Sequence, residues 1–250
     1  MNMQKHNTMK ITRLYTLFAL LMVFAMSCTK PDEPNNGENG DNNGSGGTNN
    51  DHEYVDLGLP SGTLWATCNV GAETPNDYGS YFAWGEVGFK DVYDWSTYRH
   101  CNGSSNMLTK YCNNSIYGYS GYMDNLTTLL PEDDAATVNW GNGWRTPTNE
   151  EWEELRNNTT NILTTQNGVN GRLYTASNGK SLFLPAAGYR WDDELYGVGN
   201  FGCFWSSSLR TDGPGGPSNA RYFGFLSGYY PVYGEDRCGG LSIRPVRSAE

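Results

Sequence analysis

The sequence of 250 residues contains few histidines, few basic residues and no long hydrophobic run. Of its three histidines, only His52 and His100 lie beyond residues 1–27, which disfavours zinc sites and hydrolases that depend on a histidine. The 17 Lys and Arg residues are outnumbered by 27 Asp and Glu, and the net charge of −10 disfavours nucleic acid as a partner. Hydrophobic residues make up 37% and aromatic residues 14%, so we expect a core built largely from aromatic rings and not a helical bundle.

The one apolar run covers residues 14–26 and follows a basic stretch at residues 5–13. Its 13 residues are too few to span a bilayer, which takes about 20, so the pattern predicts a lipoprotein signal peptide over residues 1–27. The sequence Ala25-Met26-Ser27-Cys28 resembles the lipobox of bacterial lipoproteins. This resemblance implies that Cys28 is acylated and anchors the protein in outer-membrane lipid. The alternative is a general secretory signal followed by an ordinary cysteine.

Residues 28–52 are composed almost entirely of small and polar residues, with Asn and Gly the most frequent. This composition predicts a disordered tether between the lipidated Cys28 and a domain that covers residues 53–250. Several acidic residues near the start of the tether resemble the surface-export signal of lipoproteins in Bacteroidetes, namely Asp32, Glu33, Glu38 and Asp41. The resemblance implies display on the cell surface.

Short apolar or alternating runs bounded by Gly, Asn and Pro dominate the domain and predict strands. They cover residues 54–57, 63–67, 81–84, 181–185, 203–206, 220–225 and 241–247. The strongest signal for a hairpin turn is Asn170-Gly171, which separates two short β-type runs.

Helices are few. One is predicted after Thr148 as N-cap, with Glu151 completing a capping box and with Trp152 and Leu155 forming the buried stripe. A second helical turn is predicted over residues 131–138, with Pro131 at its first position. Helices segregated from many short strands predict the α+β class.

Six segments of the domain occur in the order that is typical of a known family. They are residues 53–66, 81–86, 133–152, 183–190, 205–208 and 242–246. These segments resemble the Fibrobacter succinogenes major paralogous domain, which is common in secreted proteins and lipoproteins of Bacteroidetes, and more distantly the formylglycine-generating enzymes. The resemblance covers essentially all of residues 53–250. It implies a C-type lectin-like fold, with a small twisted antiparallel sheet, paired terminal strands, two short helices and long loops rich in aromatic residues, Gly and Asn.

Two segments are candidates for ligand binding. Trp191-Asp192-Asp193-Glu194 combines carboxylates with an aromatic ring, so Asp192, Asp193 and Glu194 are candidate calcium ligands, and Trp191 is suited to stack on a sugar. The alternative for this segment is a solvated turn. The second segment is the aromatic strip Tyr229-Tyr230-Pro231-Val232-Tyr233. Exposed Tyr and Trp side chains are typical of binding surfaces, so the candidate ligand contacts are Trp191, Asp192, Asp193, Tyr229, Tyr230 and Tyr233.

Five cysteines follow Cys28, an odd number, so at least one is unpaired within the monomer. The candidate disulfides are Cys101 with Cys112 and Cys203 with Cys238, because an exported protein is exposed to oxidising conditions. The resemblance to formylglycine-generating enzymes implies a copper site held by two cysteines near the C-terminal strands. Here Cys203 and Cys238 are 35 positions apart, and no closely spaced pair is present.

The sequence therefore predicts a non-enzymatic cell-surface lipoprotein whose module binds a glycan or a protein, with no catalytic residue and no cofactor apart from calcium. A fimbrial tip or assembly subunit and a copper-dependent oxidase of the formylglycine-generating type are the alternatives.

Overall fold

The computed structural model describes residues 48–49, 52–141, 143–225 and 234–249. The chain divides into two compact units, Met1–Asp41 and Asn42–Glu250, and every described residue belongs to the second. Its named strands all pair antiparallel and few helices accompany them, in agreement with the α+β class. Within the described residues, no helix has the length and apolar character needed to cross a membrane.

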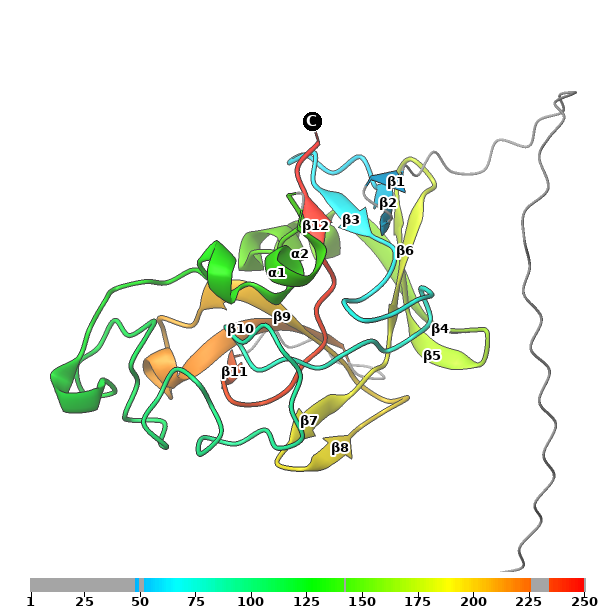
Figure 1. The fold of residues 1–250 in the computed structure, drawn as a ribbon. Helices are drawn as coiled ribbons and strands as arrows, with labels where there is room; N and C mark the ends of the chain where they lie inside the picture. The colour runs from blue at the N-terminus through cyan, green and yellow to red at the C-terminus, as the bar shows by residue number, and fades with distance from the viewer. Residues whose placement is uncertain (1–47, 50–51, 142, 226–233, 250) are drawn as a thin grey trace, which may run out of the picture. The chain divides into compact units, whose positions relative to one another are not determined.

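The first sheet joins both ends of the domain (Figure 1). Its strands, in spatial order, are β1 (Thr48–Asn49), β2 (His52–Asp56), β3 (Leu64–Ala66) and β12 (Val246–Arg247). Trp65 of β3 pairs with Val55 of β2 on one side and with Val246 of β12 on the other. The last strand therefore lies in one sheet with the N-terminal strands, as expected, but its partner is the third strand and not the first. The tether was expected to be disordered up to residue 52, but Thr48 and Asn49 already pair with β2.

The second sheet contains the longest hairpin, and its turn differs from the predicted one. Its strands are β4 (Thr159–Gln166), β5 (Val169–Ala176) and β6 (Ser181–Pro185), in that order. The turn is Asn167-Gly168, both at positive φ, so the prediction of Asn170-Gly171 was wrong. The earlier turn lets all of β4 pair with β5, and it leaves Gly171 inside β5. A Cβ at Gly171 would collide with Leu184 and Phe183 of β6, so this glycine serves close strand packing rather than a turn.

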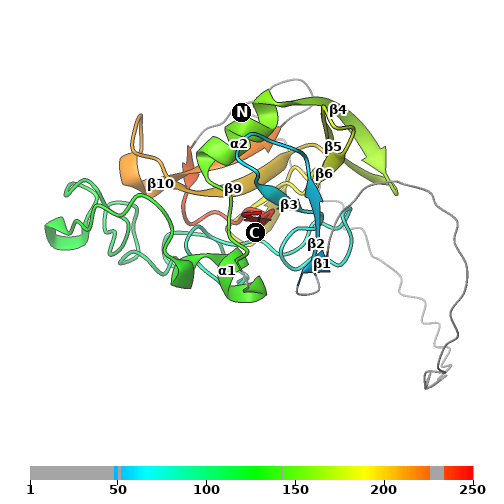
Figure 2. The same ribbon diagram turned by 90° about the horizontal axis from the view of Figure 1, so that it is seen from above.

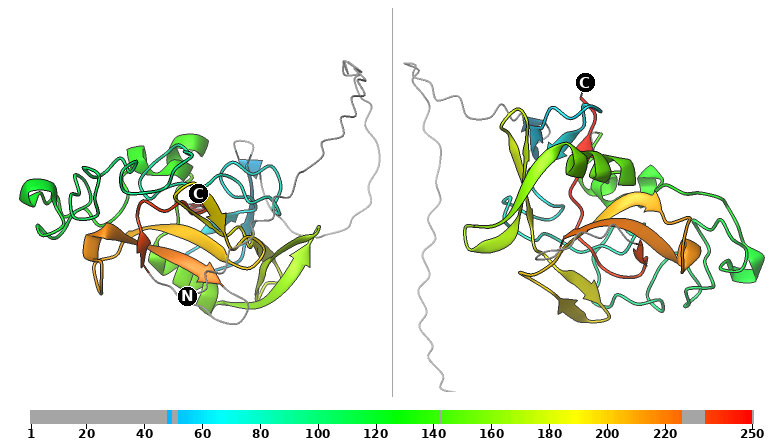
Figure 3. Two further views of the ribbon diagram at one scale, coloured as in Figure 1. Left: turned by 90° about the horizontal axis from the view of Figure 1, so that it is seen from below. Right: turned by 180° about the vertical axis from the view of Figure 1, so that it is seen from behind.

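The third sheet and a separate hairpin complete the strands. The sheet has the order β11-β10-β9, with β9 (Gly202–Leu209), β10 (Asn219–Phe225) and β11 (Gly234–Asp236). The hairpin consists of β7 (Tyr189–Trp191) and β8 (Glu194–Tyr196). Figures 1 and 3 show this hairpin close to the third sheet. An isolated bridge joins Gly188, the residue before β7, to Gly202, the first residue of β9.

Helix α2 (Asn149–Asn157) lies against β9 and β10 of the third sheet, as the view from above shows (Figure 2). The predicted capping box is confirmed in α2 (Asn149–Asn157), where Thr148 accepts from the Glu151 N–H and Glu151 accepts from the Thr148 N–H. Trp152 and Leu155 are buried as predicted. Pro131 begins a short 3-10 turn (Pro131–Asp133), and Asp134 then caps a separate α1 (Ala135–Trp140), so the second predicted helical turn is divided in two.

Aromatic rings fill the core, as the composition predicts. The largest fully buried side chains include five tryptophans, namely Trp65, Trp84, Trp144, Trp152 and Trp205. Trp152 of α2 stacks on Phe223 of β10 with ring centroids 4.6 Å apart, and its Nε1 donates to the Trp205 carbonyl. The helix is therefore held to the sheet by both ring contact and a hydrogen bond.

Two predicted strands are shorter than expected. Residues 81–84 form no strand and contribute one isolated bridge, from Phe82 to Leu241. Residues 241–247 form isolated bridges at Leu241 and Ser242 and a strand only at β12. The side chains of Phe82 and Leu241 are both buried, so the apolar pattern there reflects core packing of irregular chain.

Candidate functional site

A cavity of about 230 Å³ lies beside the third sheet. The β7–β8 hairpin, the three strands of the third sheet and the chain next to these strands line this cavity. The lining residues are Tyr189, Phe201, Gly202, Cys203, Tyr222, Gly224, Phe225, Glu235 and Leu241. This volume is below the roughly 300–1,000 Å³ of sites that enclose a whole drug-sized ligand. It suits a single ring or side chain of a larger ligand.

Glycines on neighbouring strands keep the cavity open to aromatic side chains. Gly202 of β9 pairs with Phe225 of β10, and Cys203 pairs with Gly224. A Cβ at Gly202 would collide with the Phe225 ring, so the glycine allows this ring to lie flat across the strand. The result is an aromatic wall on a rigid sheet, which is a good support for a binding site.

Glu235 is the one acidic residue in this lining. Burial raises the pKa of its carboxyl group, and the neighbouring Asp236 carboxylate raises it further. Within the described residues, no hydrogen bond or ion pair joins this carboxyl group to another side chain, and the Asp236 backbone N–H opposes the rise in its pKa. Such a group offers a directional hydrogen bond to a ligand hydroxyl or amide, and it loses less hydration when a ligand arrives than an exposed carboxylate does.

The Cys203 thiol in the same cavity is unsuited to nucleophilic or metal chemistry. Burial raises its pKa to about 12, with a further contribution from Glu235. Burial also raises the pKa of Cys238, which packs in a cluster with Tyr81 and Tyr98, whereas Cys203 packs against a different cluster. Metal ligation and nucleophilic attack both require the thiolate, which these surroundings disfavour.

The predicted disulfides are not formed, because all five cysteines of the domain are free thiols. The Cys101 thiol donates to the carbonyls of Trp95 and Tyr98, and the Cys112 thiol donates to the Asn114 carbonyl. Each sulfur of that predicted pair thus has its own backbone partner. The second predicted pair, Cys203 with Cys238, is divided between two core clusters.

The Trp191-Asp192-Asp193-Glu194 segment forms the β7–β8 hairpin, in which Trp191 pairs with Glu194 around a turn at Asp192 and Asp193. Trp191 is half-buried against the core cluster that contains Tyr81, Tyr98 and Cys238, whereas the three acidic residues are exposed. Asp192 has a φ of 56°, a conformation that Asp tolerates in turns. Glu194 accepts a hydrogen bond from the Tyr196 hydroxyl.

The hairpin contacts the cavity through its tyrosines. Tyr196 stacks on Tyr189, a residue of the cavity lining, with ring centroids 5.6 Å apart. No group of three His, Cys, Asp or Glu side chains in the described part of the chain is placed to hold a metal ion. Asp192, Asp193 and Glu194 are exposed at this turn, and their role as calcium ligands stays a prediction.

The remaining predicted site residues, Cys28, Tyr229, Tyr230 and Tyr233, lie outside the described residues. Along the chain, the three tyrosines fall between Phe225 and Glu235, both of which line the cavity. Sequence reasoning missed Glu235 itself. The available signal was a pair of acidic residues, Glu235 and Asp236, that follows an aromatic strip, and an acidic chain offers such pairs at several positions.

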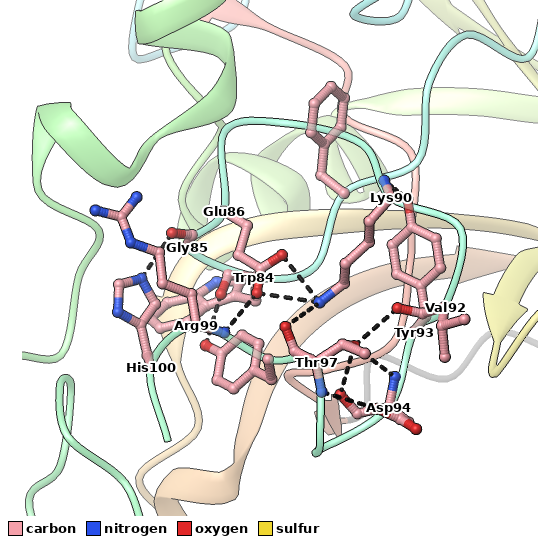
Figure 4. A network of polar contacts seen from close by, with 12 residues as sticks. Trp84, Gly85, Glu86, Lys90, Val92, Tyr93, Asp94, Thr97, Arg99 and His100 are labelled. Atoms are coloured by element: carbon pink, nitrogen blue, oxygen red, sulfur yellow. Dashed lines mark hydrogen bonds and ion pairs between the residues drawn. The ribbon is translucent and has the colours of Figure 1, made fainter. Parts of the chain in front are cut away.

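A second polar cluster lies in the long loops between residues 84 and 100 (Figure 4). Lys90 forms an ion pair with Glu86 at 3.0 Å and donates to the Thr97 carbonyl, while Glu86 also accepts from the Arg99 N–H. His100 lies with Nε2 2.8 Å from the Gly85 carbonyl. These groups are engaged with one another, so the cluster holds the loops together rather than presenting free groups to a ligand.

Comparison with family models, curated proteins and solved structures finds no match for this chain.

Proposed function

We propose that the protein is a non-enzymatic binding module that is displayed on the cell surface by acylation of Cys28. In this proposal the domain has a C-type lectin-like fold and takes a glycan or a protein as its ligand. The antiparallel sheets, the two short helices and the pairing of β12 with β3 support the fold assignment. The signal-like N-terminus and the small-residue tether support the surface location.

The observation that carries the binding proposal is Glu235 in its aromatic cavity. Within the described residues, no side chain pairs with this carboxyl group, which lies beside Tyr189 and Tyr222 and so combines a directional polar contact with ring surfaces. Sugars and protein side chains are both recognised by this combination, since their C–H faces pack on rings while their polar atoms need a hydrogen bond. The cavity volume of about 230 Å³ limits the inserted group to one ring or one side chain.

The same surroundings argue against the copper oxidase. A two-coordinate copper site needs two thiolates that converge on the metal. Cys203 and Cys238 pack in different clusters, and burial raises the pKa of both thiols.

A screen of purified protein on a glycan array, together with a pull-down from cell-surface extracts, would identify the ligand class. We expect Glu235→Leu to weaken binding by about tenfold or more, because a buried hydrogen bond to the ligand is lost. Glu235→Gln should bind more tightly than Glu235→Leu, because it keeps donor and acceptor atoms.

The matched control is Glu73→Gln, which alters an exposed carboxylate in the loop after β3 and should leave binding unchanged. Loss of binding in Asp192→Asn, or on removal of calcium with a chelator, would instead place the ligand at the hairpin. If folded protein binds nothing at micromolar concentration in either screen, the binding proposal is wrong.

A further inference from the structure

Strand β4 is an edge strand without the usual protection. In the described part of the chain its one neighbour in the sheet is β5. The two strands pair over the whole of Thr159–Gln166 without a bulge, and β4 contains no charged residue and no proline. Natural edge strands are normally protected by charge, proline, bulges or shortness, because their free N–H and C=O groups otherwise pair with another chain.

The direction of the backbone groups of β4 follows from the neighbouring strand. The backbone N–H and C=O groups of Asn170 and Ala176 in β5 point away from β4. The Asn170 carbonyl accepts from the Ala186 N–H, and the Ala176 N–H donates to the Lys180 carbonyl. Their partners on β4 are Thr165 and Thr159. In an antiparallel pair such positions are the non-hydrogen-bonded ones, so the N–H and C=O groups of Thr159 and Thr165 point away from the sheet.

The threonines of β4 are placed symmetrically about Ile162, although its direct neighbours, Asn161 and Leu163, differ. Threonine occupies both positions three residues away, Thr159 and Thr165, and both positions two residues away, Thr160 and Thr164. Antiparallel pairing of β4 with its own copy about a two-fold axis at Ile162 therefore places threonine opposite threonine at four positions. The same register brings the outward backbone groups of Thr159 opposite those of Thr165.

The exposed side chains and the charge favour the same partner. Ile162 is 61% exposed and would meet Ile162 of the second copy on the axis. The chain has a net charge of −10, so two copies repel each other over most of their surfaces, and an uncharged edge is the place where this repulsion is smallest. We propose that β4 pairs antiparallel with β4 of a second copy of this chain, in the register centred on Ile162. This interface is separate from the cavity at Glu235.

Cysteine cross-linking in the full-length chain tests the register. Opposite residues at a non-hydrogen-bonded pair lie about 4.5 Å apart at Cα, within the range that a disulfide spans. We expect Ile162→Cys to form covalent dimers on mild oxidation of membranes from expressing cells. The unsubstituted chain, with its native cysteines, sets the background.

Single Thr160→Cys and single Thr164→Cys should not exceed that background, because each lies opposite the other position and not opposite itself. Co-expression of the Thr160→Cys chain with the Thr164→Cys chain should restore the covalent dimer. Absence of a dimer with Ile162→Cys, or equal cross-linking by all single variants, would overturn the proposed pairing.

Charge substitution tests the association without oxidation. Two full-length chains with different C-terminal tags are co-expressed, and the fraction that co-purifies is measured. We expect Ile162→Lys in both chains to reduce this fraction by about tenfold, because like charges then face each other on the axis. Combining Ile162→Lys in one chain with Ile162→Glu in the other should restore it.

Val138→Lys is the matched control, since Val138 is 51% exposed on α1 and lies outside the second sheet. It should leave co-purification unchanged. Co-purification that is absent in the unsubstituted chain, or that is insensitive to Ile162→Lys, would show that β4 does not join two copies.

Discussion

At the scale of single residues, buried charges organise the long loops. Arg237 is fully buried and lies over the rings of Trp84, Tyr98 and Tyr111, with its carbon Cζ 5.0–5.8 Å from their centroids. Its guanidinium donates to the Tyr98 hydroxyl and to the carbonyls of Lys110, Tyr111 and Pro217. One side chain thus satisfies acceptors on several irregular segments, where no strand ladder is available to do so.

His100 connects this loop region to pH. Burial lowers the pKa of His100 below its ordinary value, although Asp133 nearby opposes the shift. The folded state therefore keeps the ring neutral at a pH where the unfolded chain is already protonated. Stability that comes from this difference is present above the ordinary histidine pKa and is lost as the pH falls towards the lower, folded value.

We expect the free energy of unfolding to fall from pH 7 to pH 5, and to fall less steeply in His100→Gln. Urea denaturation of both proteins at a series of pH values measures the two slopes. Identical slopes would show that His100 does not contribute to the pH dependence.

At the scale of elements, the residues that cap the N-terminus of α2 stabilise this helix directly. The Thr148 hydroxyl accepts from the Glu151 N–H, and the Glu151 carboxylate also forms an ion pair with Arg145 at 2.6 Å. Removing the cap leaves an N–H of the first turn without its partner.

Thr148→Ala should lower the free energy of unfolding by about 1 kcal/mol, the usual cost of losing such a cap. Thr148→Ser keeps the hydroxyl and should remain close to the original stability. Urea denaturation distinguishes the three proteins. Equal losses in both variants would point to the Thr148 methyl group rather than to the hydrogen bond.

Local chemistry explains which elements could be predicted from the sequence. The capping box, the buried stripe of Trp152 and Leu155, and strands such as β6 and β10 follow from short-range patterns, and the structure confirms them. The hairpin turn was misplaced because two Asn-Gly pairs lie three residues apart, and the choice between them depends on how β5 packs against β6. The cavity at Glu235 depends on contacts between distant segments, which no local pattern encodes.

At the scale of the whole molecule, our proposal assigns the attachment of the domain to the N-terminal region. Our proposal depends on Cys28 as the attachment point and on the residues after it as a tether of small and polar residues. A protein held by two or three acyl chains stays on a membrane without a spanning helix.

We expect Cys28→Ser to abolish incorporation of labelled palmitate and to move the protein from the membrane fraction into the soluble fraction. Cys68→Ser, which changes a half-buried thiol of the domain, is the control and should keep both properties. Palmitate labelling that persists in Cys28→Ser, or that is absent from the unsubstituted chain, would contradict the lipoprotein assignment.

The pairing of β2 and β12 with opposite edges of β3 has a consequence for chain topology. Both outer strands run parallel to each other, with Asp56 and Arg247 level across Leu64. The start of β2 and the end of β12 are therefore separated by only two strand spacings, about 10 Å, across the sheet and by a few residues along it. A short linker could close the domain into a ring, and the turn at Asn167-Gly168 offers a place to open it. Circular permutation of this domain, or its insertion into a loop of a host protein, would therefore preserve the pairing of β3 with β2 and with β12.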